Sequence, residues 1–210
     1  MRRKQSIIPK ILFILIVLPF AAVVILGGLN FCCYVSSRPD PDAIDQAEDY
    51  ARKHGLRTDR VILCDFSRHS GVPRFWIYNC DTERVIRRSL CAHGCGDGNT
   101  SSQPKFSNAF GSRCSSVGMY RIEGFHKMKG RYRSLKLKGL SSTNSNAERR
   151  GILIHSGRSA RHYHFGMYPF HIPLSKESEG CFSVSDGLLT RLIKMTRESD
   201  KKLLLYAYYD

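Results

Sequence analysis

The sequence predicts a mainly β domain with helices at its edges, preceded by one N-terminal transmembrane helix. Between residues 59 and 210, most segments are short, rich in β-branched and aromatic residues, and separated by turns. Helical spacing of apolar residues is clear only in 40–55 and 187–199. The 210 residues suffice for one domain with an appendage. We therefore divide the chain into a membrane segment (1–31), a linker with a bracing helix (32–58) and the β domain (59–210).

The apolar N-terminal segment predicts a signal anchor. It follows a basic flank and runs from Ile11 to Leu29, 19 residues without a charge, close to the ~20 that span a bilayer. Cores of cleaved signals are shorter, about 7–15 residues, and end in a small-residue site that is missing here. The basic flank keeps the N-terminus in the cytoplasm, so the β domain is expected outside. A cleaved signal, or lipidation at Cys32-Cys33, is the alternative.

The net charge of +15 favours anionic partners. These include nucleic acid, acidic lipid and anionic wall polymer. Because the β domain is expected outside the cytoplasm, we exclude nucleic acid and retain the other two. Ordinary solvation explains scattered surface charge equally well.

Eight cysteines in an oxidising compartment raise the expectation of disulfides. The six that follow the membrane segment are Cys64, Cys80, Cys91, Cys95, Cys114 and Cys181. If Cys181 is a free thiol, an odd number remains, so at least one more is unpaired. The sequence does not define their connectivity.

Two helices are predicted at the edges of the domain. The first begins at Pro41 with Asp40 as its cap, and Gly55 ends it. The second is capped by Asp186 and covers residues 187–199. Its apolar residues share one face: Leu188, Leu189, Leu192, Ile193 and Thr196.

Short β-type runs fill most of the remaining chain. The first three are joined by turns and predict a meander. Residues 158–176 have no clear period and predict a loop. The β-type runs are 61–66, 74–80, 84–94, 117–124, 132–140, 151–157 and 201–209.

Cys181 and His155 are the candidates for a catalytic pair. His155 ends an apolar strand, and Cys181 follows a glycine in a polar, turn-like run. A cysteine attacks a carbonyl as the thiolate, which a nearby histidine helps to form. The preceding Gly180 permits a sharp turn and exposes main-chain N–H groups to a developing oxyanion. On these residues alone, an inert buried thiol or a half-cystine explains Cys181 as well.

Five motifs in fixed order carry a resemblance to a known family. They are CAHGCGDG (91–98), KFSNAFGSRCSSVGMYRI (105–122), LKLKGL (135–140), GILIHSG (151–157) and SEGCFSVS (178–185). Together they resemble the YkuD-type L,D-transpeptidases, and in particular the murein L,D-transpeptidase catalytic domain, or second YkuD, branch.

The resemblance implies an L,D-transpeptidase-type β-sandwich or barrel over residues 59–210 and a cysteine acyltransferase acting on peptidoglycan stem peptides. Such enzymes cleave the bond between an L-centre and a D-centre in a tetrapeptide stem, releasing D-alanine. The acyl group then passes to an amine of a second stem and forms a 3→3 cross-link. Transfer to water, an L,D-carboxypeptidase activity, is one alternative. A non-catalytic wall-binding protein on the same fold is another.

The resemblance also implies roles for individual residues. Cys181 is the nucleophile, and His155 is its base. The Ser156 carbonyl orients the imidazole, and the N–H groups of Gly180 and Cys181 form the oxyanion hole. Ser178 supports the loop through hydrogen bonds.

A second group of residues has a substrate-binding or supporting role in the resemblance. These are His93, Ser115 and Ser116. On general grounds the two serines, like Ser112, are turn-formers.

Two features depart from the better-known family pattern. Glu179 stands where many relatives have histidine, which affects stabilisation of the thiolate. The interval between His155 and Cys181 is long, and we interpret residues 158–176 as an inserted loop on the substrate side.

No metal or other cofactor is expected. The run Cys91-Ala92-His93-Gly94-Cys95 offers half of a zinc-like ligand set, but no second compact pair follows. His162, His164 and His171 are left unassigned. The expected partners are therefore peptidoglycan stem peptides and, through the anchor, the membrane. We expect a monomer, anchored in the inner membrane of a bacterial envelope with its catalytic domain on the periplasmic side.

Overall fold

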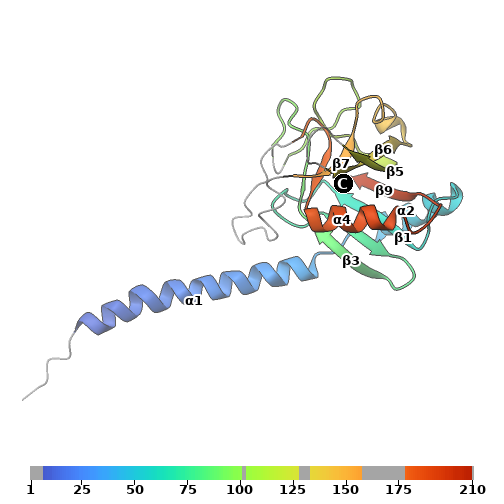
Figure 1. Ribbon diagram of the computed structural model, residues 1–210. Coiled ribbons are helices and arrows are strands. Elements are labelled where there is room, and N and C mark those ends of the chain that lie inside the picture. Colours follow the sequence, from blue (N-terminus) through green and yellow to red (C-terminus); the bar gives the residue numbers. More distant parts are fainter. Residues whose placement is uncertain (1–6, 101–102, 128–132, 158–177, 210) are drawn as a thin grey trace, which may run out of the picture.

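The computed structural model describes residues 7–100, 103–127, 133–157 and 178–209. Figure 1 shows one β domain with α2 and α4 at its periphery and α1 projecting away from it. The helices are α1 (Ile7–Ser36), α2 (Pro41–Lys53), the 3-10 turn η1 (Ser142–Asn144) and α4 (Asp186–Met195). The strands are β1 (Arg60–Asp65), β2 (Phe75–Asn79), β3 (Arg84–Ser89), β4 (Cys91–Ala92), β5 (Gly118–Lys127), β6 (Arg133–Gly139), β7 (Leu153–Ser156), β8 (Phe182–Val184) and β9 (Leu203–Tyr208). The predicted mainly β class is confirmed.

The nine strands form one sheet in the order β3-β2-β1-β9-β5-β6-β7-β8-β4. The first three pair antiparallel, so the predicted meander is confirmed. β9 inserts at the centre of the sheet, parallel to β1 and antiparallel to β5. A strand from the C-terminal part of the chain therefore joins the meander to the remaining strands.

The sheet is nearly closed into a barrel. Its two terminal strands, β3 and β4, are separated in the chain only by Leu90. The fully buried Arg74 spans this closure, because its Nε donates to the Cys91 carbonyl at 2.9 Å while its backbone N–H donates to Ser89. The closed arrangement leaves little free sheet edge.

The run of apolar residues in β1 reflects burial on both faces of the sheet. Ile62 and Cys64 point into the barrel core, whereas Val61 and Leu63 pack beneath α2. The helix approaches closely because it presents a stripe of buried alanines. These are Ala43, Ala47 and Ala51.

The predicted bracing helix forms as α2. Asp40 is its N-cap and accepts a hydrogen bond from the Asp42 N–H at 2.8 Å, and Pro41 is the first residue. Beyond the helix, Arg57 pairs with Asp59 at 2.6 Å and donates to the Met195 carbonyl at 3.0 Å. The brace is thereby tied to the end of α4.

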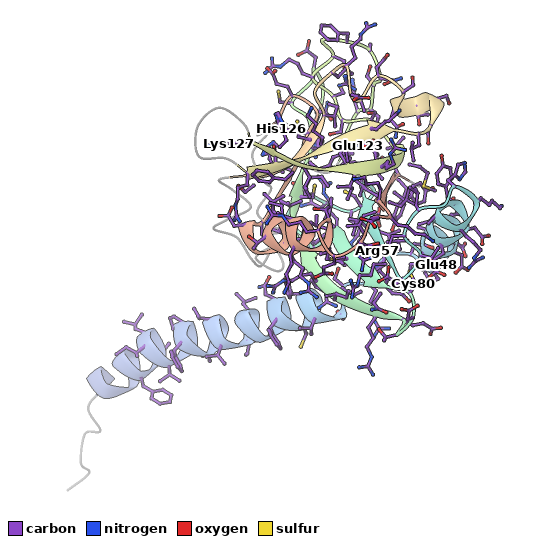
Figure 2. The ribbon with its side chains drawn as sticks, turned by 45° about the vertical axis from the view of Figure 1, so that its right-hand side comes forward. Glu48, Arg57, Cys80, Glu123, His126 and Lys127 are labelled. Atoms are coloured by element: carbon purple, nitrogen blue, oxygen red, sulfur yellow. The ribbon has the colours of Figure 1, made fainter. Side chains whose placement is uncertain are left out.

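The surface between α2 and β2 carries a half-buried thiol. Figure 2 shows Glu48, Arg57 and Cys80 on one side of the molecule. Burial raises the pKa of Cys80, and a hydrogen bond with Glu48 raises it further. These surroundings favour the thiol form of Cys80 over the thiolate.

The second predicted helix begins one residue from the expected cap. Ser185, not Asp186, is the N-cap: its backbone is extended, and its hydroxyl accepts from the Leu188 N–H at 3.4 Å. Asp186 instead lies in the first turn, where its charge favours the positive helix end. The predicted apolar face is buried, apart from the partly exposed Thr196.

Most described side chains of α1 are exposed, and the helix is long and apolar enough to cross a membrane. A signal sequence near the N-terminus would meet the same criteria of length and composition. The helix extends beyond Phe31 to Ser36. Ser37 then fixes the chain to the domain, because its hydroxyl donates to the Pro73 carbonyl at 3.0 Å and accepts from Trp76 Nε1 at 3.3 Å.

The expected disulfides do not form. All eight cysteines fall within the described residues, and all are free thiols. Cys64 and Cys91 are buried in the same core cluster, where they pack as small apolar side chains.

Candidate active site

β7 and β8 lie side by side and bring the two candidate catalytic residues into one region. They pair in parallel, with Ile154 opposite Phe182 and His155 opposite Ser183. Ile154 and Phe182 both enter the core. Because side chains alternate along a strand, His155 points to the face opposite Ile154, and Cys181 directly precedes the first residue of β8.

The Cys181 thiol contacts the backbone at the start of β7. Its sulfur accepts from the Leu153 N–H at 3.4 Å, and the thiol donates to the Gly151 carbonyl at 3.7 Å. Among the described contacts, no hydrogen bond joins this thiol to His155. Catalytic hydrogen bonds are often long in unliganded enzymes and shorten in the substrate complex.

The imidazole of His155 is held by its own strand. Its Nδ1 lies 3.1 Å from the carbonyl oxygen of Ser156. A carbonyl only accepts, so Nδ1 carries the proton in this contact and Nε2 is left with its lone pair. This tautomer suits a base that takes a proton through Nε2.

Gly180 adopts a backbone conformation that other residues rarely reach. Its φ is +115°, and a Cβ there would lie 2.6 Å from the Cys114 carbonyl oxygen. Both the left-handed backbone and the close approach require glycine. The sharp turn expected before Cys181 is therefore present.

Two serines hold the Cys181 loop, which we define as residues 178–181. Ser178 Oγ donates to the Cys181 carbonyl at 2.7 Å and closes the loop on itself. Ser115 Oγ accepts from the Gly94 N–H at 3.0 Å and donates to the Gly180 carbonyl at 3.1 Å. The buried Ser115 hydroxyl thus links the His93-Gly94 segment to the loop.

His93 and Ser116 lie in the interior. His93 is 5% exposed, and its Nδ1 lies 2.7 Å from Nη2 of the buried Arg74. The Ser116 hydroxyl pairs with the Tyr120 hydroxyl at 2.7 Å. Their burial fits a supporting role and leaves no surface of either for a substrate in this structure.

Burial is the largest influence on the Cys181 thiol, and it raises the pKa. The hydrogen bond from Leu153 and the positive charge of Arg150 oppose this effect, whereas the charge of Glu179 adds to it. Glu179 itself is exposed and pairs with the Arg113 guanidinium at 3.4 Å. The residue in the usual histidine position therefore disfavours the thiolate.

Arg150 is a neighbour of the site that the sequence did not reveal. Its Nη2 donates to the Cys114 carbonyl at 2.5 Å and lies 3.1 Å from where a Gly180 Cβ would stand. It precedes the apolar strand in a polar loop, and no motif distinguished it from its neighbour Arg149.

Some predicted features fall outside the described residues. These are the inserted loop (158–176) and the histidines within it, His162, His164 and His171. Within the described part of the chain, no group of three His, Cys, Asp or Glu side chains is placed to hold a metal ion.

Comparison with known proteins identifies the family. A model of the L,D-transpeptidase catalytic domain matches residues 39–208. No curated protein matches the chain.

Two solved structures resemble the chain at low sequence identity. An L,D-transpeptidase from Xylanimonas cellulosilytica is 16% identical, with a TM-score of 0.39, and the match covers 76% of this chain and 68% of that one. An L,D-transpeptidase from Stackebrandtia nassauensis is 12% identical, with a TM-score of 0.39, covering 79% of this chain and 64% of that one. Since the family model spans most of the sequence, the chain belongs to the L,D-transpeptidase catalytic domain family.

Proposed function

We propose that this protein is a cysteine-dependent L,D-transpeptidase that forms 3→3 cross-links between peptidoglycan stem peptides. Membership of the family supports peptidoglycan cross-linking or a related activity. The observation that supports the finer assignment is the parallel pairing of β7, which contains His155, with β8, which begins directly after Cys181.

In the first half-reaction, His155 Nε2 takes the proton from the Cys181 thiol. The sulfur attacks the carbonyl of the L-centre, a carbon–sulfur bond forms, and the carbonyl oxygen becomes an oxyanion. The main-chain N–H groups of Gly180 and Cys181 stabilise that charge. On collapse the carbon–nitrogen bond breaks, and the proton from His155 leaves with the amine of D-alanine.

In the second half-reaction, a side-chain amine of another stem attacks the thioester. His155 accepts its proton, the new amide forms, and the carbon–sulfur bond breaks to restore the thiol. Water in place of the amine gives the trimmed tripeptide of a carboxypeptidase.

The Ser156 carbonyl supports this cycle by fixing the imidazole. Its contact with Nδ1 keeps Nε2 available as the base and stabilises the imidazolium that forms. Unlike a carboxylate, a carbonyl carries no charge, so the imidazolium is stabilised only modestly.

The site works outside the cytoplasm in this proposal, with α1 as an inner-membrane anchor and the domain acting as a monomer. The length and composition of α1 and the basic residues before it support this placement. Four positive charges lie in the flank that stays in the cytoplasm, so anionic wall material meets a part of the chain with a net charge of +11.

The first test is covalent capture by a carbapenem, an acylating β-lactam. The purified protein should gain the mass of one carbapenem, and Cys181→Ala should remove that gain. Cys95→Ala, another partly buried thiol, is the matched control and should acylate normally. Absence of an adduct on the wild-type protein would refute the nucleophile and favour a wall-binding module.

The second test identifies the reaction. Muropeptides from cells expressing the wild-type protein should contain 3→3 cross-links that Cys181→Ala abolishes. Tripeptides without cross-links would assign the carboxypeptidase activity instead.

A further inference from the structure

We propose that Arg150 is a positioning residue of the site, which holds the main chain that packs against Gly180 and supplies a positive charge beside the Cys181 loop. This inference rests on the proposed role of Cys181 as nucleophile.

The guanidinium of Arg150 joins three points of one neighbouring segment. Nη1 donates to the Ser107 carbonyl at 2.7 Å. Nη2 donates to the Ser112 hydroxyl at 3.2 Å and to the Cys114 carbonyl at 2.5 Å. The planar guanidinium of Arg150, with its rigidly spaced donors, therefore holds the main chain of residues 107–114 in place.

That segment forms the surface against which Gly180 packs. The Cys114 carbonyl is the atom closest to the missing Cβ of Gly180, at 2.6 Å. The next residue, Ser115, donates to the Gly180 carbonyl at 3.1 Å. A shift of the Cys114 carbonyl would therefore move the loop that carries the thiol.

The charge of Arg150 is not neutralised by its own partners. All three acceptors are uncharged, and no ion pair of Arg150 occurs among the described residues. The acid closest in sequence to the thiol, Glu179, pairs with Arg113 instead. The field of Arg150 is thus free to act on Cys181, and it lowers the pKa of that thiol against the effect of burial.

The matched control is the preceding residue. Arg149 is exposed, and its guanidinium lies 5.6 Å from the ring centroid of Phe110. Arg149 and Arg150 carry the same charge on neighbouring residues, but only Arg150 contacts the Cys114 carbonyl.

The experiment measures alkylation of Cys181 by iodoacetamide against pH, using the full chain in detergent. Trypsin cleaves after Lys176 and Arg191 and releases a peptide in which Cys181 is the sole cysteine, so mass spectrometry follows this thiol alone. Alkylation needs no peptidoglycan. A failure of the cross-linking assay is therefore distinguishable from a failure of this inference.

Arg150→Gln should move the alkylation midpoint to higher pH and slow the reaction about three- to tenfold at pH 8. Arg150→Lys keeps the positive charge but loses the planar set of guanidinium donors. It should therefore change the alkylation midpoint less than Arg150→Gln does. Arg149→Gln should match the wild type.

An unchanged midpoint in folded Arg150→Gln would overturn the inference, even if thermal unfolding showed lost stability. If Arg150→Gln does not fold, Arg150→Lys decides. Because lysine cannot bridge the same acceptors, its alkylation should be about two- to threefold slower, and a wild-type rate would overturn the inference.

Discussion

An arginine stabilises each of two regions of the molecule, Arg74 at the barrel closure and Arg150 beside the Cys181 loop, but the two arginines have different roles. Each guanidinium donates to uncharged groups of more than one other residue. Arg74 is fully buried, and its charge acts on the Cys64 thiol in the core. Arg150 is partly exposed, and its charge acts on the Cys181 thiol. The hydrogen-bond pattern alone therefore does not distinguish a structural arginine from a functional one. The two differ in the thiol on which the charge acts, because Cys64 is buried in the core and Cys181 is partly exposed.

The strongest test of this comparison is Arg74→Ala. It leaves the carbonyls of Arg68 and Cys91 without their donor and opens a cavity beside Phe66. We expect a loss of about 3–5 kcal/mol in the free energy of unfolding, measured by urea denaturation. The exposed Arg84, replaced by alanine, should change it by less than about 0.5 kcal/mol. Equal effects would mean that the closure does not depend on the buried guanidinium.

Gly180→Ala perturbs the Cys181 loop instead of the barrel closure. The new Cβ would meet the Cys114 carbonyl, and alanine is strained at a φ of +115°. We expect about 1–3 kcal/mol of destabilisation and, from the displaced thiol, about a 10²-fold slower carbapenem acylation. Gly111→Ala has similar backbone strain at φ +76° with open space around it. Its acylation rate should be that of the wild type; slow acylation there as well would assign the loss to strain in general.

Ser115→Ala and Ser116→Ala compare the Cys181 loop with the barrel core by changing adjacent residues. Removing Ser115 leaves the Gly94 N–H and the Gly180 carbonyl unpaired, and removing Ser116 takes a partner from Tyr120. Each should cost about 1–3 kcal/mol by thermal unfolding. Only Ser115→Ala should also slow carbapenem acylation. A slowing of equal size in both variants would show that lost stability, not loop position, controls the thiol.

Glu179→Gln should have the smallest effect. The carboxylate raises the pKa of Cys181, so its removal should lower that pKa and speed alkylation near pH 8. Because Glu179 is exposed, the change should stay below about twofold and shrink at high salt.

The direction in which alkylation of Cys181 shifts with pH can be predicted for the wild type and for Glu179→Gln. Burial raises the pKa of the thiol, so its alkylation should still be increasing at about pH 8.5, the ordinary cysteine value, in the wild type. In Glu179→Gln the curve should lie at slightly lower pH. A shift to higher pH would contradict the assigned sign.

Local patterns predicted the elements well. The capped helix at Asp40-Pro41, the first three strands and the apolar strand ending at His155 form where the sequence places them. Ser185 was missed as a cap because Ser185 and Asp186 both suit that position, and only the backbone conformation distinguishes them.

Contacts between residues far apart in the chain could not be predicted from the sequence. The position of β9 between β1 and β5 depends on pairing across the whole chain. Arg150 was missed because its acceptors are mainly backbone carbonyls, which carry no residue signal. The roles of Cys181, His155 and Ser156 stay predictions, although β7 and β8 lie in the register that those roles need.

The central position of β9 has a consequence for the timing of folding. β1 and β5, the strands that flank it, leave the ribosome well before residues 203–208 do. Until β9 arrives, the meander and the β5–β8 half of the sheet have no shared strand, and the barrel cannot close. The barrel therefore closes only after residues 203–208 have been made, which places completion of the fold late in the synthesis of these strands.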